Sequence, residues 1–132
     1  MSASDYLEDK VLGYVYTGAA FAQPGTKYLA LFTAPPSDVS GTGAEVGATG
    51  TGYARQAIGF TKSGSAPTQV TNTTQFDFPA ATTAWGTLTH WATFDALSGG
   101  NPLNYGAFTV AKTIGVGDIM RIPASSVTIT AD

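Results

Sequence analysis

Residues 85–95, WGTLTHWATFD, decide the fold class, because polar and apolar side chains alternate along the whole stretch. A period of two places alternate side chains on opposite faces of a sheet. One face would carry Leu88, His90, Ala92 and Phe94. The other would carry Thr87, Thr89, Trp91 and Thr93. We therefore expect a long strand whose Thr-rich outer face is interrupted by an outward-facing indole, that of Trp91.

Similar short segments recur along the chain, separated by turn signals such as the SGGN of residues 98–101 and a turn-rich break at residues 62–67. Further strands are expected around residues 28–34, 53–60, 69–73, 75–79, 103–111, 119–122 and 126–130. Charged residues make up only 11% of the chain, and Thr, Ser, Gly and Ala replace them. This spacing and composition predict an all-β protein, a jelly-roll or Greek-key β-sandwich.

The N-terminal segment is the one part predicted to be helical. Leu7, Val11, Leu12 and Val15 recur at helical spacing, Ser4 is a suitable N-cap, and Gly18 a natural stop. We expect a short helix of about three turns within a helical arm at residues 1–18. Its apolar stripe should be buried either on the β domain or on a neighbouring subunit.

Residues 35–52 contain almost no large apolar side chain and begin with Pro35-Pro36. Such a segment buries too little surface to offset the entropy of ordering, so we expect a long, flexible surface loop. Loops of this length are often functional, which makes this one a candidate for contacting a partner.

The size and charge of the chain exclude several classes of protein. With 132 residues, residues 1–132 should form a single domain. A net charge of −3 without a cluster of Lys or Arg argues against nucleic-acid binding. The sequence has no cysteine, no apolar stretch long enough for a membrane span and no secretory signal at its start. We therefore expect a protein made in the cytoplasm, with no membrane partner.

No residue pattern indicates catalysis. His90 is the only histidine, and in mid-strand a structural imidazole is far commoner than a catalytic one. The nine acidic residues are scattered, so a glycosidase pair could form only by convergence in space, and we favour surface acids instead. We expect no enzyme activity, no cofactor and no metal.

The aromatic residues allow two interpretations, because an exposed ring on a sheet can stack on a sugar whereas a buried one fills a core or an interface. We favour core or interface. The residues that we expect to contact partners lie on the arm, on the loop and on the outer sheet face: Tyr6, Leu7, Val11, Tyr14, Val39, Val46, Tyr53 and Trp91.

Several phrases together resemble a known family: SDYLE at residues 4–8, YLALFTA at 28–34, GYARQ at 52–56, FPAA at 78–81, and WGT at 85–87 running to FDA at 94–96. They are similar to small proteins of tailed phages and prophages that are often described as phage tail fiber proteins. The chain is also similar to the jelly-roll cement proteins that decorate phage capsids. The resemblance spans nearly the whole chain and implies a virion structural protein.

A fibre normally needs length, repeats or a shaft, and this chain has none of them. We therefore expect a capsid decoration or cement protein on the outer surface of the capsid. Its partners would be the major capsid protein and further copies of itself, in a homo-oligomer such as a dimer or trimer. Each copy would bridge capsid subunits by burying apolar surface across them. The alternative is a tail-fibre or tail-tip module that recognises host glycans through Trp91.

Overall fold

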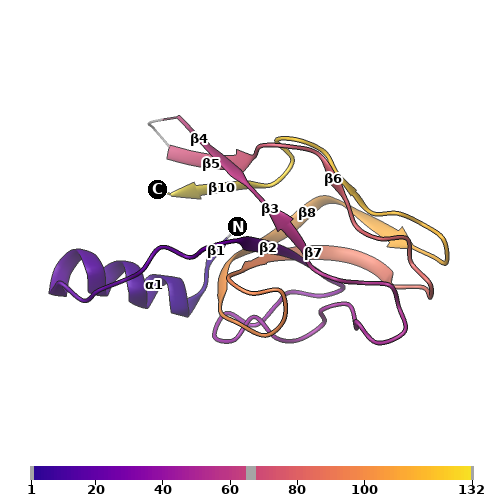
Figure 1. The fold of residues 1–132 in the computed structure, drawn as a ribbon, viewed down its shortest axis with the longest axis horizontal. Coiled ribbons are helices and arrows are strands. Elements are labelled where there is room, and N and C mark those ends of the chain that lie inside the picture. The colour runs from indigo at the N-terminus through magenta and orange to yellow at the C-terminus, as the bar shows by residue number, and fades with distance from the viewer. Residues whose placement is uncertain (1, 65–67, 132) are drawn as a thin grey trace.

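The computed structural model describes residues 2–64 and 68–131, and shows two main antiparallel sheets that face each other (Figure 1). The larger sheet has the strand order β1-β8-β7-β2-β3, and the smaller has the order β10-β5-β4. A third, two-stranded sheet pairs β6 with β9. One helix, α1 (Asp5–Leu12), lies near the N-terminus. The prediction of an all-β sandwich with a short N-terminal helix is confirmed.

The strands lie close to the positions expected from the sequence. In the larger sheet they are β1 (Ser2–Ala3), β2 (Lys27–Phe32), β3 (Gln56–Ile58), β7 (Gly86–Phe94) and β8 (Pro102–Ile114). The others are β4 (Phe60–Ser63), β5 (Thr68–Asn72), β6 (Phe76–Asp77), β9 (Arg121–Ile122) and β10 (Thr128–Ala131). The expected strand at 53–60 is divided between the two sheets, since Gly59 separates β3 from β4. The predicted break at 62–67 falls partly on residues 65–67, outside the described residues.

The centre of the larger sheet, formed by β2 and the second half of β7, is buried on both faces. Leu29 and Leu31 of β2 point into the main core between the sheets, whereas Ala30 and Phe32 belong to a second apolar cluster on the opposite face. The long loop and the turn between β7 and β8 supply the cover for this second cluster, because Gly41 lies directly against the Phe94 ring. The sandwich therefore continues into an irregular third layer.

The predicted outward position of Trp91 is wrong, because this side chain is only 5% exposed and packs in the main core with Leu88. Strict alternation would place these two residues on opposite faces. The alternation nevertheless holds from His90 to Phe94, since Trp91 pairs with Leu31 of the main core and Ala92 pairs with Ala30 of the second cluster. Leu88 is the residue that departs from it, and a register shift in the pairing with β8 lies between Leu88 and His90. Trp91 is buried because the face that carries it belongs to the main core between the sheets.

The helix begins and ends as predicted. Ser4 is the N-cap, and its hydroxyl accepts a hydrogen bond from the Leu7 backbone N–H at 3.2 Å. After α1 the chain continues as a short π-helical segment, η1 (Gly13–Thr17), and ends at Gly18 in the left-handed conformation. No residue of α1 or η1 is buried, and the β domain covers only the Leu7 end of the apolar stripe, while Val11, Leu12 and Val15 are exposed.

Candidate functional site

The long connection between β2 and β3, here called loop 33–55, is irregular but held closely against the larger sheet. It lacks strands as predicted, apart from one isolated bridge between Phe32 and Glu45. The Thr33 N–H donates to the Ala44 carbonyl at 2.9 Å, and the Val46 N–H donates to the Leu31 carbonyl at 3.0 Å. The loop therefore lies along the sheet instead of projecting as a free arm.

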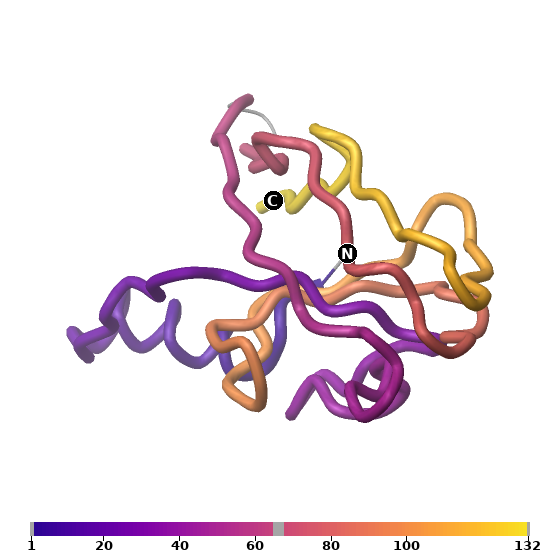
Figure 2. Tube along the Cα trace, turned by 45° about the vertical axis from the view of Figure 1, so that its right-hand side comes forward, coloured from indigo at the N-terminus to yellow at the C-terminus, as the bar shows by residue number. Residues whose placement is uncertain are grey.

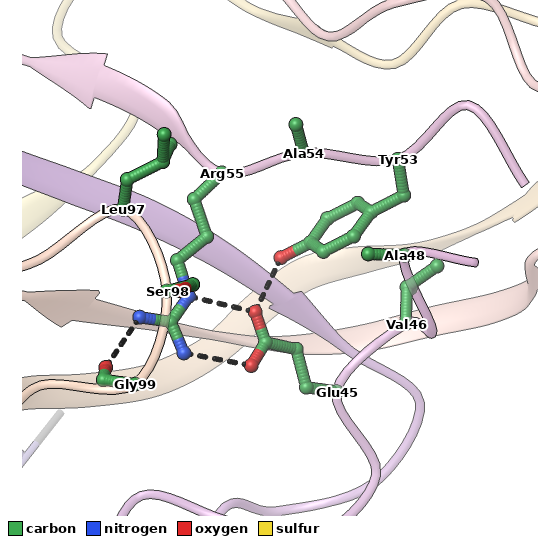
Figure 3. Close-up of a pocket in the computed structure, with 9 residues that line it drawn as sticks. All are labelled: Glu45, Val46, Ala48, Tyr53, Ala54, Arg55, Leu97, Ser98 and Gly99. Carbon is green, nitrogen blue, oxygen red and sulfur yellow. Dashed lines mark hydrogen bonds and ion pairs between the residues drawn. The ribbon is translucent and has the colours of Figure 1, made fainter.

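Arg55, Glu45 and Tyr53 form a cluster at the end of this loop, here called the Arg55 cluster (Figure 3). The Arg55 guanidinium donates to both carboxylate oxygens of Glu45, at 2.8 Å through Nε and 2.9 Å through Nη2. Its Nη1 donates to the carbonyls of Ala96 and Gly99, at 3.0 and 2.8 Å. The guanidinium also lies 3.7 Å from the Phe94 ring centroid. One side chain thus joins the loop, the turn between β7 and β8, and the sheet.

Tyr53 completes the cluster. Its hydroxyl donates to Glu45 Oε2 at 2.7 Å and accepts the Leu31 N–H at 3.1 Å. Burial, with the nearby Glu45 carboxylate as a second cause, raises the pKa of Tyr53 well above its ordinary value. The ring stacks on Phe78 and meets Trp85 edge to face, with centroid distances of 6.0 and 5.5 Å. Tyr53 is therefore a protonated core residue with both sides of its hydroxyl satisfied.

A hollow of about 370 Å³ lies beside this cluster, between the loop and the exposed Leu97 and Ser98 of the turn (Figure 3). The charged side chains that line it, Glu45 and Arg55, already bind each other and the neighbouring backbone. A ligand would have to break these bonds in order to use either charge. We conclude that the Arg55 cluster holds the structure together and that the hollow is a poor binding site.

The arm has the opposite character. Its large apolar side chains from Val11 to Tyr16 are between 46% and 79% exposed, and α1 extends away from the sheets (Figures 1 and 2). We call this surface the arm patch; it consists of Val11, Leu12, Tyr14, Val15 and Tyr16. Clustered exposed apolar side chains of this size typically mark a protein contact.

A groove of about 600 Å³ continues the arm patch towards the sandwich. Leu7, Val11 and Leu12 line it on the helix side, and Ile129 and Ala131 of the β10 edge line it on the other. The arm patch and the groove thus form one continuous apolar surface, made of the projecting helix and of the groove between the helix and the β10 edge.

The first turn of the helix anchors the arm. The Ser4 N–H donates to the Leu103 carbonyl at 2.8 Å, and the buried Ser4 hydroxyl donates to the Pro102 carbonyl. The Asp5 N–H donates to the Asp38 carbonyl of the loop at 3.2 Å. A hydrogen bond between the Asp5 and Asp38 side chains raises the pKa of Asp5, and the Asp38 charge adds to this shift. The base of the arm is therefore fixed while its tip is free of intramolecular cover.

The predicted contact residues divide into two groups. Val11 and Tyr14 on the arm and Val39 on the loop are exposed, while Tyr6 and Leu7 are half-buried, so their contact role stays a prediction. Val46, Tyr53 and Trp91 are buried, and the expectation that they meet a partner is wrong for the folded chain. Val46 and Tyr53 belong to the core because loop 33–55 folds back onto the sheet.

Some of the important residues were not among the predicted contacts. Leu12 and Val15 belong to the apolar stripe that the helical spacing predicts, and Tyr16 extends it. Glu45 and Arg55 are the only charged residues between Asp38 and Lys62, and that isolation of two opposite charges is the signal that could have paired them.

The structure adds little to the search for chemistry. His90 is half-buried, and its Nδ1 forms a hydrogen bond with the Thr89 hydroxyl at 2.8 Å. Among residues 2–64 and 68–131, no three His, Asp or Glu side chains gather as a metal site requires. Across the same residues, no helix has the length and apolar character needed to cross a membrane.

Comparison with known proteins identifies a family. Residues 2–130 match the family described as podophage GP4 fiber I protein gp80. The match spans the whole sandwich together with the arm. No curated protein matches the chain.

Proposed function

The chain belongs to the podophage GP4 fiber I protein gp80 family of phage virion proteins, and from this premise we propose that it is a structural subunit held on the virus particle through its N-terminal arm. The observation that carries the proposal is the arm patch. Five large apolar side chains stand in water on a helix that buries none of its own residues.

The energy available from the arm patch can be compared with the cost of association. Fully burying one such side chain contributes about 1.5–3 kcal/mol, so five half-exposed ones supply on the order of 5 kcal/mol. Association itself costs about 4–15 kcal/mol. The arm patch alone would therefore bind weakly, and a stable attachment needs the adjoining groove or several copies acting together.

We place the subunit in or beside a fibre of the virion, because the family is described by a fibre protein. The arm would insert its apolar face between neighbouring protein surfaces, in the manner of an amphipathic helix in a groove. Recognition of glycans through Trp91 has no support, because the indole is buried in the core.

Capsid decoration, which ranked first on the sequence alone, is the second candidate. The compact sandwich without a repeat or a shaft favours it, since many copies of a small domain suit the surface of a shell. In that case the arm and the exposed Val39 of the loop would contact the major capsid protein, and copies would bridge adjacent subunits.

Quantitative mass spectrometry of purified virions separates the two positions. Copy numbers close to those of the tail proteins would support the fibre position, and numbers comparable to those of the major capsid protein would support decoration. Immunogold labelling of the same particles should mark the tail for the first and the whole head for the second.

The attachment through the arm is tested by complementing a phage that lacks this gene. The variant Leu12→Ser with Val15→Ser should be recruited to virions at less than about a tenth of the wild-type level, because each change removes apolar burial. The control is Val110→Ser, at a still more exposed valine on β8, which should be recruited normally. Equal recruitment of the arm variant and the control would refute attachment through the arm.

A further inference from the structure

An apolar cavity lies between the two sheets, separate from the hollow beside the Arg55 cluster. Its volume is about 270 Å³. Phe60, Val70 and Ile129 of the smaller sheet form one wall, and Leu103 of the larger sheet and Leu7 of the helix form the other. The segment between the arm and β2 contributes Phe21 and Pro24. Apolar side chains from four parts of the chain thus surround one space.

The interior of this cavity has almost no free polar group. Apart from Lys27, its polar residues are Thr93 and Asn104. The Thr93 hydroxyl donates to the Asn104 carbonyl at 3.3 Å and accepts the Asn104 N–H at 3.1 Å. The Asn104 side-chain amide donates to the Ser2 carbonyl at 3.5 Å. Whatever occupies the interior should therefore be hydrocarbon, because a polar group would lose its hydrogen bonds there.

Lys27, the first residue of β2, gives the cavity a single positive charge. Its ammonium donates to the carbonyls of Pro24 and Gly25 at 3.4 and 3.3 Å, the second of these bonds lying at the exposed surface. The ion pairs found within the described residues join Lys10 with Asp9, Arg55 with Glu45, and Arg121 with Asp77. Lys27 thus stands at the rim of an apolar cavity with long bonds to neutral carbonyls.

We propose that this cavity binds a free, single-chain anionic amphiphile, with its hydrocarbon chain between the two sheets and its anionic head at Lys27. The volume lies just below the usual range of small-molecule sites, about 300–1,000 Å³, and leaves room for one chain only. A peptide segment fits less well, because its backbone N–H and C=O groups would find no partners inside. The charge of Lys27 selects an anionic head over a cationic one.

Isothermal titration calorimetry of the full chain tests the proposal with decanoate and decyltrimethylammonium, each below its micelle concentration, and with decanol below its solubility limit. Decanoate should bind, decanol should bind about ten-fold more weakly, and the cation should bind most weakly, because only the carboxylate can pair with Lys27. Equal binding of all three, or no binding of decanoate, would overturn the proposal.

Two variants and a control locate the site. Lys27→Met keeps the aliphatic stem and should lower decanoate affinity about ten-fold while leaving decanol binding unchanged. Lys112→Met changes an exposed lysine of β8 that does not line the cavity, and it should leave the affinities for decanoate and for decanol unchanged. Val70→Phe should fill the cavity and abolish binding of both ligands, and Ile129→Phe serves the same purpose if the first variant does not fold.

Two further measurements would contradict a free amphiphile in this cavity. Flotation of the protein with phosphatidylglycerol vesicles, without uptake of free decanoate, would indicate a membrane surface instead. A dimer in analytical ultracentrifugation that Val70→Phe dissociates would show that a second copy covers the cavity. A monomer that takes up decanoate in the ratio of one to one would support the proposal.

Discussion

Loop 33–55 and the N-terminal arm are held by opposite means. The loop has no regular secondary structure beyond one bridge, yet it places Val46, Tyr53 and Arg55 in buried positions. The arm is helical from Asp5 to Thr17 and is capped by Ser4 and Gly18, yet none of its helical residues is buried. Regular backbone structure and tertiary burial are therefore separate properties, and here they are divided between the two regions.

The difference follows from where the hydrogen bonds of each region are made. A helix satisfies its backbone groups within itself, so it can project into water without a tertiary partner. An irregular loop has no such internal ladder, and this one satisfies its polar groups through Arg55, Tyr53 and the strand edges. We infer that the loop supports the fold and that the arm is available for a partner.

The largest effect should come from removing the charge that fixes the loop. Arg55→Met leaves the half-buried Glu45 carboxylate without its partner and removes two hydrogen bonds to the turn between β7 and β8. We expect a loss of about 3 kcal/mol in the free energy of unfolding, measured by urea denaturation. Arg121→Met breaks the exposed pair with Asp77 and should cost much less, because water screens that pair. Equal costs would mean that the Arg55 cluster does not support the fold.

A smaller loss should follow from adding one methyl group inside the loop. Gly41 has a φ of 64°, and a Cβ there would lie 2.7 Å from the Pro102 Cβ and 2.8 Å from the Phe94 ring. Gly41→Ala should therefore cost about 2 kcal/mol through overpacking and backbone strain. Gly50→Ala has a similar φ of 70° but open space around it, and should cost only about 1 kcal/mol. Thermal unfolding of both variants would show whether the loop is packed as tightly as the structure indicates.

A still smaller effect is expected where the arm meets the loop. Because Asp38 raises the pKa of Asp5, the folded state binds a proton at Asp5 more tightly than the unfolded state does. This contribution to stability is complete below the ordinary carboxyl pKa and is lost as the pH rises through the raised value. Asp38→Asn should make the decrease of stability with rising pH smaller and should give slightly higher stability at neutral pH. Urea denaturation midpoints measured between about pH 3.5 and 7 would show both effects.

The smallest effect on stability is expected at the tip of the arm. Val15→Ser combined with Tyr16→Ser changes two exposed side chains and should alter the free energy of unfolding by less than about 0.5 kcal/mol. The same change at the buried Val127 should cost about 2 kcal/mol or more. A large loss from the arm variant in urea denaturation would show that the arm is part of the core in solution.

Much of the fold could be predicted because its signals are local. The alternation in residues 85–95 predicts β7, and Ser4 and Gly18 predict the limits of the helical segment. The burial of Trp91 could not be predicted, because β7 alone does not show that both of its faces are covered, one by the main core and the other by the second cluster. The apolar stripe predicted the arm patch, but whether the β domain covers it depends on where the helix leaves the sheet.

The all-β class, the helix at the N-terminus and the position of the long loop follow from local patterns, since propensity, capping and alternation act over a few residues. The folded chain was needed to establish that the loop is packed, that Glu45 meets Arg55, and that the arm patch is uncovered. These facts depend on contacts between segments far apart in the chain. Local patterns carry no information on such distances, so burial had to be found in the fold.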